Sequence, residues 1–157
     1  MTEPLIDLSD LDLTAQAMTE EELRANIPHA HEWRMIDGIC HLDLEQNIIV
    51  GYKDWDDDPW WARGHIPGRP LMPGVLMIEG SAQVATILMR AGGWEGAEFI
   101  GLGGVDKARF RGMVTPPSRV HFVSKKGSQS NRMARYFSQA FVGGKLIFEM
   151  DLLGVKI

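Results

Sequence analysis

The stretch PGVLMIEGSAQVATILMR, residues 73–90, predicts one long helix that is buried on all sides. Proline is tolerated in the first turn of a helix, so Pro73 fits its start. Gly92 and Gly93 supply a stop signal directly after it. Apolar residues point in every direction around this helix, and such a helix lies in the interior of a protein. The rest of the chain must therefore wrap around it.

The other elements expected around this helix are mostly extended. Residues 33–52 are expected to be extended and end in β-branched and aromatic residues, which favour a strand. The segment 53–63, which contains an acidic tract, is expected to form a loop. Val142-Gly143-Gly144-Lys145 is typical of a two-residue hairpin turn, which joins antiparallel strands. Further strands are expected at about 98–103, 105–114, 118–126, 131–142 and 145–155. The prediction is an α+β fold, with an antiparallel β-sheet wrapped around one long central helix. Such a sheet leaves an edge and a face to cover, which favours a dimer.

The chain divides into an acidic N-terminal extension, residues 1–25, and a single domain, residues 26–157. The first 23 residues carry seven acidic groups and no Lys or Arg. We expect residues 1–17 to be poorly ordered or loosely docked. Thr19 and Glu22 have the spacing of a capping box, which predicts a short helix near 20–26 that stops at Pro28.

Composition argues against several classes of function. The net charge of −5 argues against nucleic acid as the main partner. The helix at 73–90 is shorter than the roughly 20 apolar residues that a membrane span needs. Cys40 is the single cysteine, and the N-terminus lacks a signal peptide, which predicts a cytoplasmic protein. No metal or redox cofactor is expected. The acidic tract 54–58 lacks the ligand pattern of a calcium loop, and His29, His31 and His41 with Cys40 are the only other candidate metal ligands.

Four polar residues form a stripe on the apolar helix. Glu79, Gln83, Thr86 and Arg90 follow one another at steps of four, three and four, so they share one helix face. The stripe must line a neighbouring strand, a partner subunit or a cavity. Gln83 and Thr86 also fit a satisfied buried network. Burying a carboxylate is costly unless it is paired or protonated, so Glu79 is a candidate general acid.

A histidine precedes the helix in a loop rich in glycine and proline. His65 lies 14 residues before Glu79 (79 − 65), and the stiff loop fixes its backbone. The helix N-terminus near Gly74 and Val75 has free backbone N–H groups that can stabilise a developing oxyanion. A loop histidine is also compatible with a structural or merely exposed role. The segment nevertheless encodes a base, an acid and an oxyanion donor.

Residues 64–83, GHIPGRPLMPGVLMIEGSAQ, resemble the signature of the β-hydroxyacyl-acyl carrier protein dehydratases of type II fatty acid synthesis. Ile27-Pro28-His29 through Met35-Ile36-Asp37 is similar to a second family motif. Residues 104–111, GVDKARFR, are similar to a third. The resemblance covers about 26–153 and implies a hot-dog fold.

The resemblance implies a role for each residue that matches the signature. His65 would remove the C2 proton of a 3-hydroxyacyl thioester, and Glu79 would protonate the departing C3 hydroxyl. The Gly74 N–H would hold the thioester carbonyl, the Leu71 carbonyl would orient His65, and Gln83 would position Glu79. Glutamate at the acid position resembles the branch that dehydrates without isomerising. In the family the two residues of one site come from different subunits, which implies a homodimer, and many members form trimers of dimers.

The resemblance also implies a carrier and an acyl tunnel. The substrate would arrive on acyl carrier protein, which is acidic, or on coenzyme A. A basic rim at Lys107, Arg109 and Arg111 is the expected docking site, although these residues also fit a solvated strand face. The residues expected along the substrate tunnel are His31, Trp60, Trp61, Val75 and Phe110. Simple core filling is the alternative for the two tryptophans.

Two other functions are compatible with the same fold. A non-catalytic acyl-binding or scaffold subunit is favoured by two departures from the family pattern. His31 stands where the family has a tyrosine associated with the tunnel mouth, and the acidic N-terminal extension has no assigned counterpart. An acyl-thioesterase is a further hot-dog activity, although its sites lack this arrangement of histidine and glutamate.

Overall fold

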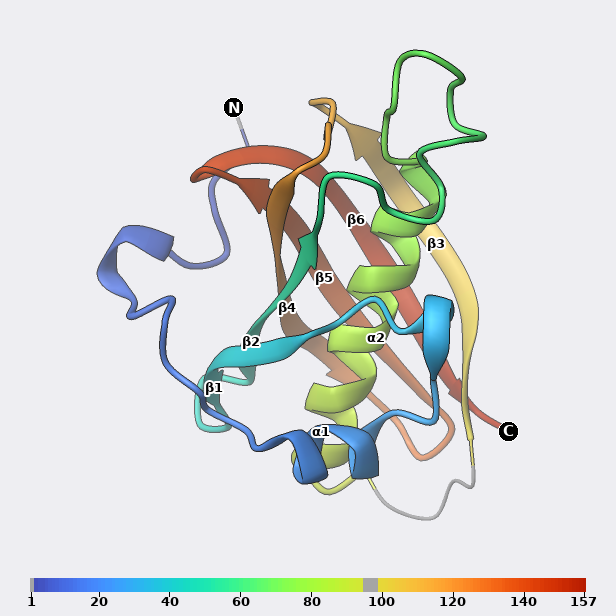
Figure 1. The fold of residues 1–157 in the computed structure, drawn as a ribbon. Coiled ribbons are helices and arrows are strands. Elements are labelled where there is room, and N and C mark those ends of the chain that lie inside the picture. The colour runs from blue at the N-terminus through green and yellow to red at the C-terminus, as the bar shows by residue number, and fades with distance from the viewer. Residues whose placement is uncertain (1, 95–98) are drawn as a thin grey trace.

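The computed structural model describes residues 2–94 and 99–157, and its fold is a curved sheet around one long helix (Figure 1). The helix α2 spans Gly74–Ala91. The strands are β1 (Gly38–Asp43), β2 (Ile48–Trp55), β3 (Ile100–Phe110), β4 (Ser118–Gln129), β5 (Met133–Val142) and β6 (Lys145–Lys156). They form one sheet in the order β1-β2-β4-β5-β6-β3, in which all neighbours are antiparallel. The predicted architecture is confirmed.

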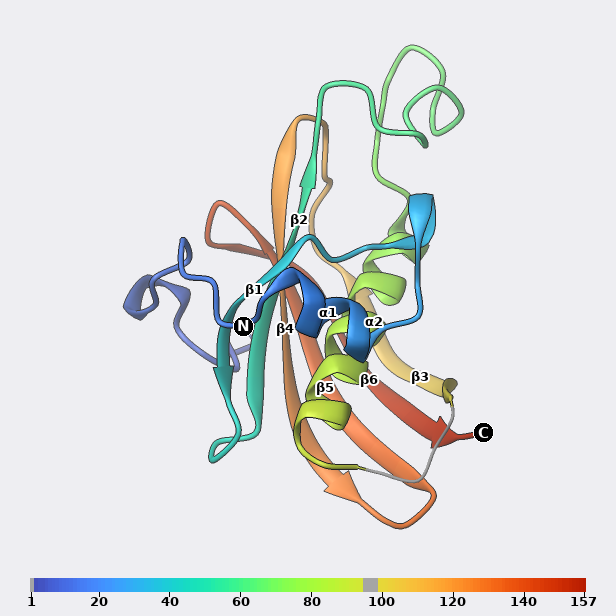
Figure 2. The same cartoon turned by 60° about the horizontal axis from the view of Figure 1, so that its bottom comes forward.

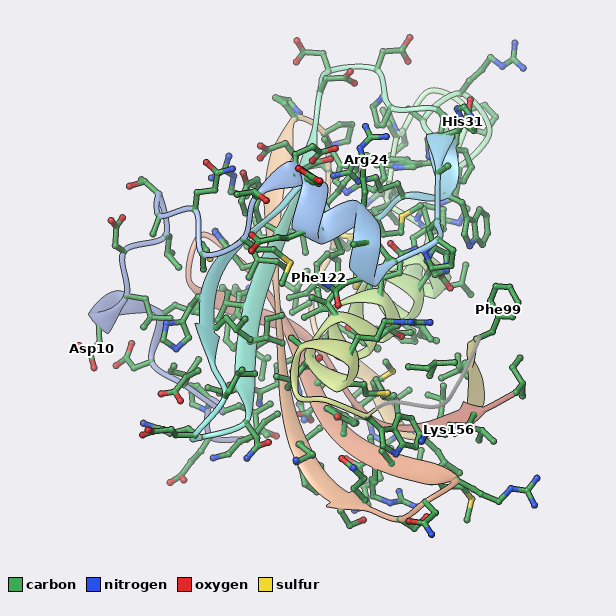
Figure 3. The ribbon with its side chains drawn as sticks, turned by 90° about the horizontal axis from the view of Figure 1, so that it is seen from below. Asp10, Arg24, His31, Phe99, Phe122 and Lys156 are labelled. Atoms are coloured by element: carbon green, nitrogen blue, oxygen red, sulfur yellow. The ribbon has the colours of Figure 1, made fainter. Side chains whose placement is uncertain are left out.

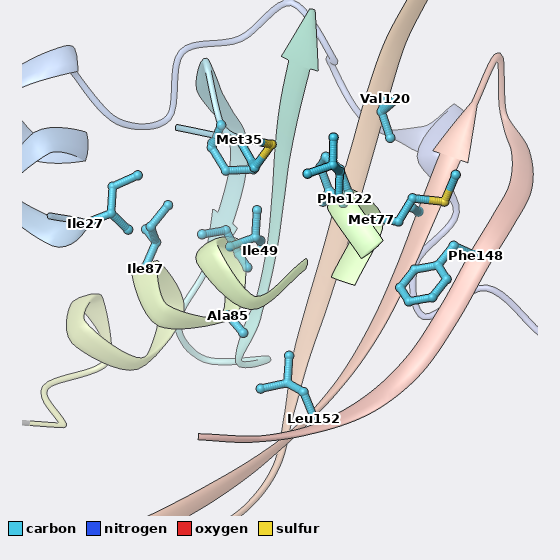
Figure 4. Packing of buried hydrophobic residues seen from close by; sticks show 14 of the residues in the cluster. Ile27, Met35, Ile49, Met77, Ala85, Ile87, Val120, Phe122, Phe148 and Leu152 are labelled. Atoms are coloured by element: carbon cyan, nitrogen blue, oxygen red, sulfur yellow. The ribbon is translucent and has the colours of Figure 1, made fainter. Parts of the chain in front are cut away.

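Close packing fixes α2 against the sheet. A Cβ atom added to Gly80 would lie 2.5 Å from Cζ of Phe122, so the aromatic ring of β4 rests directly on the helix backbone. Phe122 and Phe148 from the sheet share one core with Ala85 and Ile87 from α2 (Figure 4). Because the core side of α2 is fixed in this way, the side chain of Glu79 is held on the remaining, partly open side.

The local signals at turns and caps are confirmed. The capping box at Thr19 and Glu22 opens α1 (Glu20–Asn26). Gly143 and Gly144 have positive φ angles of 55° and 76° between the paired residues Val142 and Lys145, as a tight hairpin turn requires.

Several strand boundaries differ from the prediction. The segments predicted at 98–103 and 105–114 form the single strand β3, whose pairing with β6 shifts register at two places; residue 98 lies outside the described residues. The first shift falls between Leu102 and Gly104, so the glycines make a bulge and not a turn. The predicted loop at 53–63 is wrong at its start, because β2 continues to Trp55, opposite Ser118.

The expectation of a loosely docked N-terminus is wrong. Residues of the N-terminal segment, including η1 (Leu8–Asp10), pack on the face of the sheet that is turned away from α2 (Figure 2). Leu8 belongs to a small apolar cluster there with Cys40, Val123 and Phe141. The backbone N–H of Leu5 donates to Oε1 of Gln139 at 2.7 Å. Burial of leucine side chains therefore anchors an acidic segment that composition alone describes as solvated.

Candidate active site

The loop before α2 holds His65 in a defined orientation. The backbone N–H of His65 donates to the Trp61 carbonyl at 2.9 Å, and the N–H of Leu71 donates to the His65 carbonyl at 2.8 Å. Nδ1 of the ring lies 2.6 Å from the carbonyl oxygen of Leu71. A carbonyl can only accept, so Nδ1 must carry the proton in this contact. The neutral ring then has its lone pair on Nε2, which is the form a general base needs.

The start of α2 lies in the same cavity as His65. This cavity has a volume of about 230 Å³ and is lined by His65, Leu71, Met72, Gly74, Met77, Phe110, Gly112 and Met113. Gly74 is the first residue of α2, and the first amides of a helix have no acceptor within it. A Cβ atom at position 74 would lie 2.8 Å from Cε1 of Phe110, so the close ring leaves room only for glycine. An anionic oxygen beside this backbone would therefore find an N–H donor close to His65.

Gln83 connects Glu79 to the segment before β1. Its Nε2 donates to Oε1 of Glu79 at 2.8 Å and to the carbonyl of Trp33 at 2.7 Å. Its Oε1 accepts from the backbone N–H of Met35 at 2.9 Å. The amide of Gln83 is 1% exposed, and these contacts use both its oxygen and its nitrogen. Glu79 is thus oriented from one side by a side chain that is itself locked.

A second histidine faces Glu79, and the sequence analysis assigned it no role. Nε2 of His29 lies 3.4 Å from Oε1 of Glu79. Its Nδ1 is buried and has no hydrogen-bond partner in the part of the chain that the structure describes. The only signal in the sequence is the Pro28-His29 motif, because the contact spans 50 residues of chain (79 − 29). His29 therefore belongs to the surroundings of the candidate acid.

The polar stripe lines a cavity, which was one of three predicted alternatives. Glu79, Gln83 and Thr86 all border the same space, together with His29. Arg90 lies beyond them, in the last turn of α2. None of the residues that line this cavity also lines the cavity of His65. Within one chain, the candidate base and the candidate acid therefore belong to two separate cavities.

The residues expected along the substrate tunnel fall into different environments. Phe110 lines the His65 cavity, and both Val75 and Trp60 are exposed. His31 begins the short helix η2 (His31–Trp33) and has a positive φ angle of 54°. Its side chain is exposed, and Figure 3 shows it on the opposite side of the molecule from Asp10. Trp61 is buried, and its ring packs edge-on against the ring of Trp55, with 5.6 Å between the two ring centroids. Core filling thus accounts for Trp61.

The expected basic rim is not a free basic surface. Nζ of Lys107 pairs with Asp151 at 3.2 Å, and the guanidinium of Arg111 pairs with Glu149. Arg109 donates to the carbonyl of Ala108. Because carboxylates of β6 neutralise two of the three cations, the alternative of a solvated strand face fits them better.

Two further features bear on the expected functions. No helix within residues 2–94 and 99–157 is long and apolar enough to cross a membrane. In the same ranges, no group of three or more His, Cys, Asp or Glu side chains is placed to hold a metal ion.

An antiparallel sheet around one helix, with a histidine before the helix and a glutamate within it, defines a hot-dog protein with a candidate acid–base site. Residues 27–151 match the family model of the FabA-like domain, and the chain belongs to this family.

Curated relatives carry one name. The 3-hydroxyacyl-[acyl-carrier-protein] dehydratase FabZ of Sinorhizobium fredii is 33% identical over 132 residues, which cover 84% of this chain and 85% of the relative. FabZ of Rhizobium etli is 32% identical over 145 residues, or 92% of this chain and 88% of that protein. FabZ of Moorella thermoacetica is 31% identical over 128 residues, which cover 81% of this chain and 88% of that protein.

Solved structures share the fold at low identity. The dehydratase heterocomplex ApeI:P from Xenorhabdus doucetiae superimposes with a TM-score of 0.71 at 13% identity, over 86% of this chain and 90% of that chain. The virulence protein Cj0977 from Campylobacter jejuni gives a TM-score of 0.68 at 14% identity. The superposition covers 94% of this chain and 96% of that chain. These likenesses concern the fold alone.

Proposed function

We propose that this protein dehydrates 3-hydroxyacyl thioesters, carried on acyl carrier protein, to trans-2-enoyl thioesters and water. Nε2 of His65 removes a proton from C2, and the electrons of the C2–H bond form the C2=C3 double bond. The C3–O bond breaks, and Glu79 gives its proton to the departing hydroxyl, which leaves as water. The backbone N–H of Gly74 donates to the thioester carbonyl, where negative charge develops. Proton exchange with solvent then restores both side chains.

One observation carries the assignment of the base. The carbonyl of Leu71 holds the proton on Nδ1 of His65, which leaves Nε2 as the basic atom, and His65 lines the cavity that contains the start of α2. The names of the relatives support the reaction, and neither the scaffold nor the thioesterase alternative is favoured by them. The Gln83 amide supports Glu79 as the acid, since it fixes one oxygen and leaves the other for the substrate.

A shared site accounts for the separation of the two cavities. Val75, Phe110 and Met113 are apolar residues at or near the His65 cavity, and each is more than half exposed in the single chain. Apolar side chains gathered in this way mark a surface that another protein covers. We therefore assign this face to a second copy of the chain, whose Glu79 cavity completes the site of His65.

The reaction is tested in the reverse direction with crotonyl thioesters of acyl carrier protein and of coenzyme A. Hydration is followed as the loss of enoyl absorbance. His65→Ala and Glu79→Gln should each lower kcat by about 10²–10⁴-fold, because each removes a positioned acid or base. Circular dichroism should show that both variants retain the fold. Substantial activity in either variant would contradict the assigned roles, and absence of activity in the unmodified protein on both carriers would contradict the function.

A further inference from the structure

The cavity beside Glu79 extends along α2, away from the reacting groups. Its volume is about 130 Å³. Beyond Glu79 and Gln83, the helix contributes Ala82, Thr86 and Met89 to its wall. The sheet contributes mostly apolar residues and glycines from the neighbouring strands β3 and β6, namely Ile100, Gly101, Leu102, Leu152 and Gly154. The cavity is thus polar at the end of Glu79 and largely apolar farther along the helix.

Met89 is the residue of α2 that lines this cavity farthest from Glu79. Ten residues separate the two along the helix, which corresponds to about 15 Å of helix axis. The side chain of Met89 is 2% exposed. A Cβ atom added to Gly154 would lie 2.6 Å from Cε of Met89 and 3.0 Å from its Sδ. The methionine tip therefore rests directly on the backbone of β6 and fills the space between helix and sheet.

In the proposed function the acyl chain of the substrate enters the apolar part of this cavity, and we propose that Met89, seated on Gly154, is the end wall that limits its length. This inference rests on the proposed function, in which Glu79 acts at C3 of the substrate. With C3 at the polar end, the carbons beyond it run between α2 and the strands β3 and β6. A chain that reaches Met89 has no space to continue, so Met89 and Gly154 together set the longest chain that is turned over efficiently.

Two substitutions should shift the chain-length preference in opposite directions. Met89→Ala removes the wall and lets longer chains enter. Each extra methylene that is buried should then raise kcat/KM by about fourfold relative to the unmodified protein. Gly154→Ala adds a methyl group where the methionine tip lies, and this flexible tip must move into the cavity. Gly154→Ala should therefore lower kcat/KM for the longest substrates accepted and leave the shortest ones nearly unchanged.

The measurement is kcat/KM for 3-hydroxyacyl thioesters of four, six, eight, ten and twelve carbons, all on one carrier. Met150→Ala is the matched control, since Met150 is also buried, lies in β6 and does not line this cavity. The control should change all chain lengths by the same factor. If Met89→Ala does not fold, Gly154→Ala alone decides the inference.

Unchanged profiles in the folded variants, with an active unmodified protein, would overturn the end wall and leave the proposed function standing. Inactivity of the unmodified protein at every length would overturn the proposed function itself, and the end wall with it.

Discussion

Gln83 shows how one side chain can tie a candidate acid to a loop. Its amide contacts Glu79, Trp33 and Met35, so its loss frees both the carboxylate and the segment before β1. We expect Gln83→Leu to lower kcat by about 10²-fold with a smaller change in KM, because a misplaced catalytic group loses its alignment with the substrate.

Ser81→Ala is the control for Gln83→Leu. Ser81 is fully buried on the same helix, and its hydroxyl has no hydrogen-bond partner among the described residues. Steady-state kinetics should show normal turnover in this control. Equal losses of kcat in both variants would mean that Gln83 acts only through the stability of α2.

His121 makes the stability of the fold sensitive to pH. Burial lowers its pKa below 6.5, the nearby guanidinium of Arg119 lowers it further, and Asp54 partly opposes these effects. Below pH 6.5 the unfolded chain therefore binds more protons than the folded one, so the free energy of unfolding falls as the pH decreases from about 6.5 toward the folded pKa. Asp54, whose pKa is lowered mainly by its hydrogen bonds with Arg119, loses its contribution only in a more acidic window, below 3.8.

Urea unfolding between pH 8 and pH 5 measures the effect of His121. We expect His121→Gln to flatten the decrease below pH 6.5, because glutamine does not titrate. The same slope in both proteins would assign the pH dependence to other groups.

At the residue scale, the sequence predicted what lies close together along the chain. The contact between His65 and the Leu71 carbonyl spans six residues, and the one between Gln83 and Glu79 spans four. Both were expected from the resemblance. The contact of His29 with Glu79 depends on how the chain between α1 and η2 packs against α2, and no local pattern specifies this packing. The partners of Lys107 and Arg111 escaped prediction for the same reason, since they lie on a neighbouring strand.

The position of helix α2 depends on the contact between Gly80 and Phe122. Alanine is favoured over glycine within a helix by about 1 kcal/mol, so helix propensity alone predicts that Gly80→Ala stabilises the protein. The added Cβ would meet three atoms of the Phe122 ring at 2.5–2.9 Å, and this ring is fully buried. Overpacking of this kind costs about 1–3 kcal/mol, which exceeds or offsets the gain in helix propensity, so we expect a net destabilisation of up to about 2 kcal/mol.

Urea unfolding tests the Gly80 prediction. Combining Gly80→Ala with Phe122→Leu should cost less than the sum of the two single substitutions, since the smaller side chain leaves room for the new methyl group. A stabilised Gly80→Ala protein would show that the ring moves away at little cost.

At the element scale, periodicity and capping predicted the helices better than the ends of the strands. The apolar run and its flanking Pro73 and Gly92 specify α2 because they act within a few residues. The strand β3 was predicted as two pieces, 98–103 and 105–114, and the break between them falls at Gly103 and Gly104. Pairing with β6 runs through this point and absorbs the glycines in a bulge. A Cβ atom at Gly103 would overlap the side chain of Val155, so the close approach of the two strands explains the glycine.

At the scale of the whole molecule, the order of the predicted helix and strands indicated the class of fold and not which strands pair. Antiparallel hairpins follow from turns such as Val142-Gly143-Gly144-Lys145, but the pairing of β3 with β6 and of β2 with β4 joins distant segments. The N-terminal extension was misjudged because its charge is visible in the sequence, whereas the apolar patch that it covers exists only in the folded sheet.

The proposed division of the site between two subunits makes a prediction about mixtures of inactive proteins. A dimer of His65→Ala with Glu79→Gln would contain one site that lacks both groups and one site that retains both. Coexpression of the two variants with different tags, followed by purification through both tags, should therefore restore crotonyl thioester hydration to about half that of the unmodified dimer.

Each variant purified alone should remain inactive, and sedimentation velocity should show that all three preparations have the same oligomeric state. If both residues of one site came from the same chain, every site in the mixed dimer would lack one group, and coexpression would restore nothing. The exposed apolar side chains of Val75, Phe110 and Met113 should be buried in the dimer. Val75→Asp should accordingly weaken the dimer and abolish turnover together, because a monomer keeps its two cavities but cannot bring His65 and Glu79 to the same substrate.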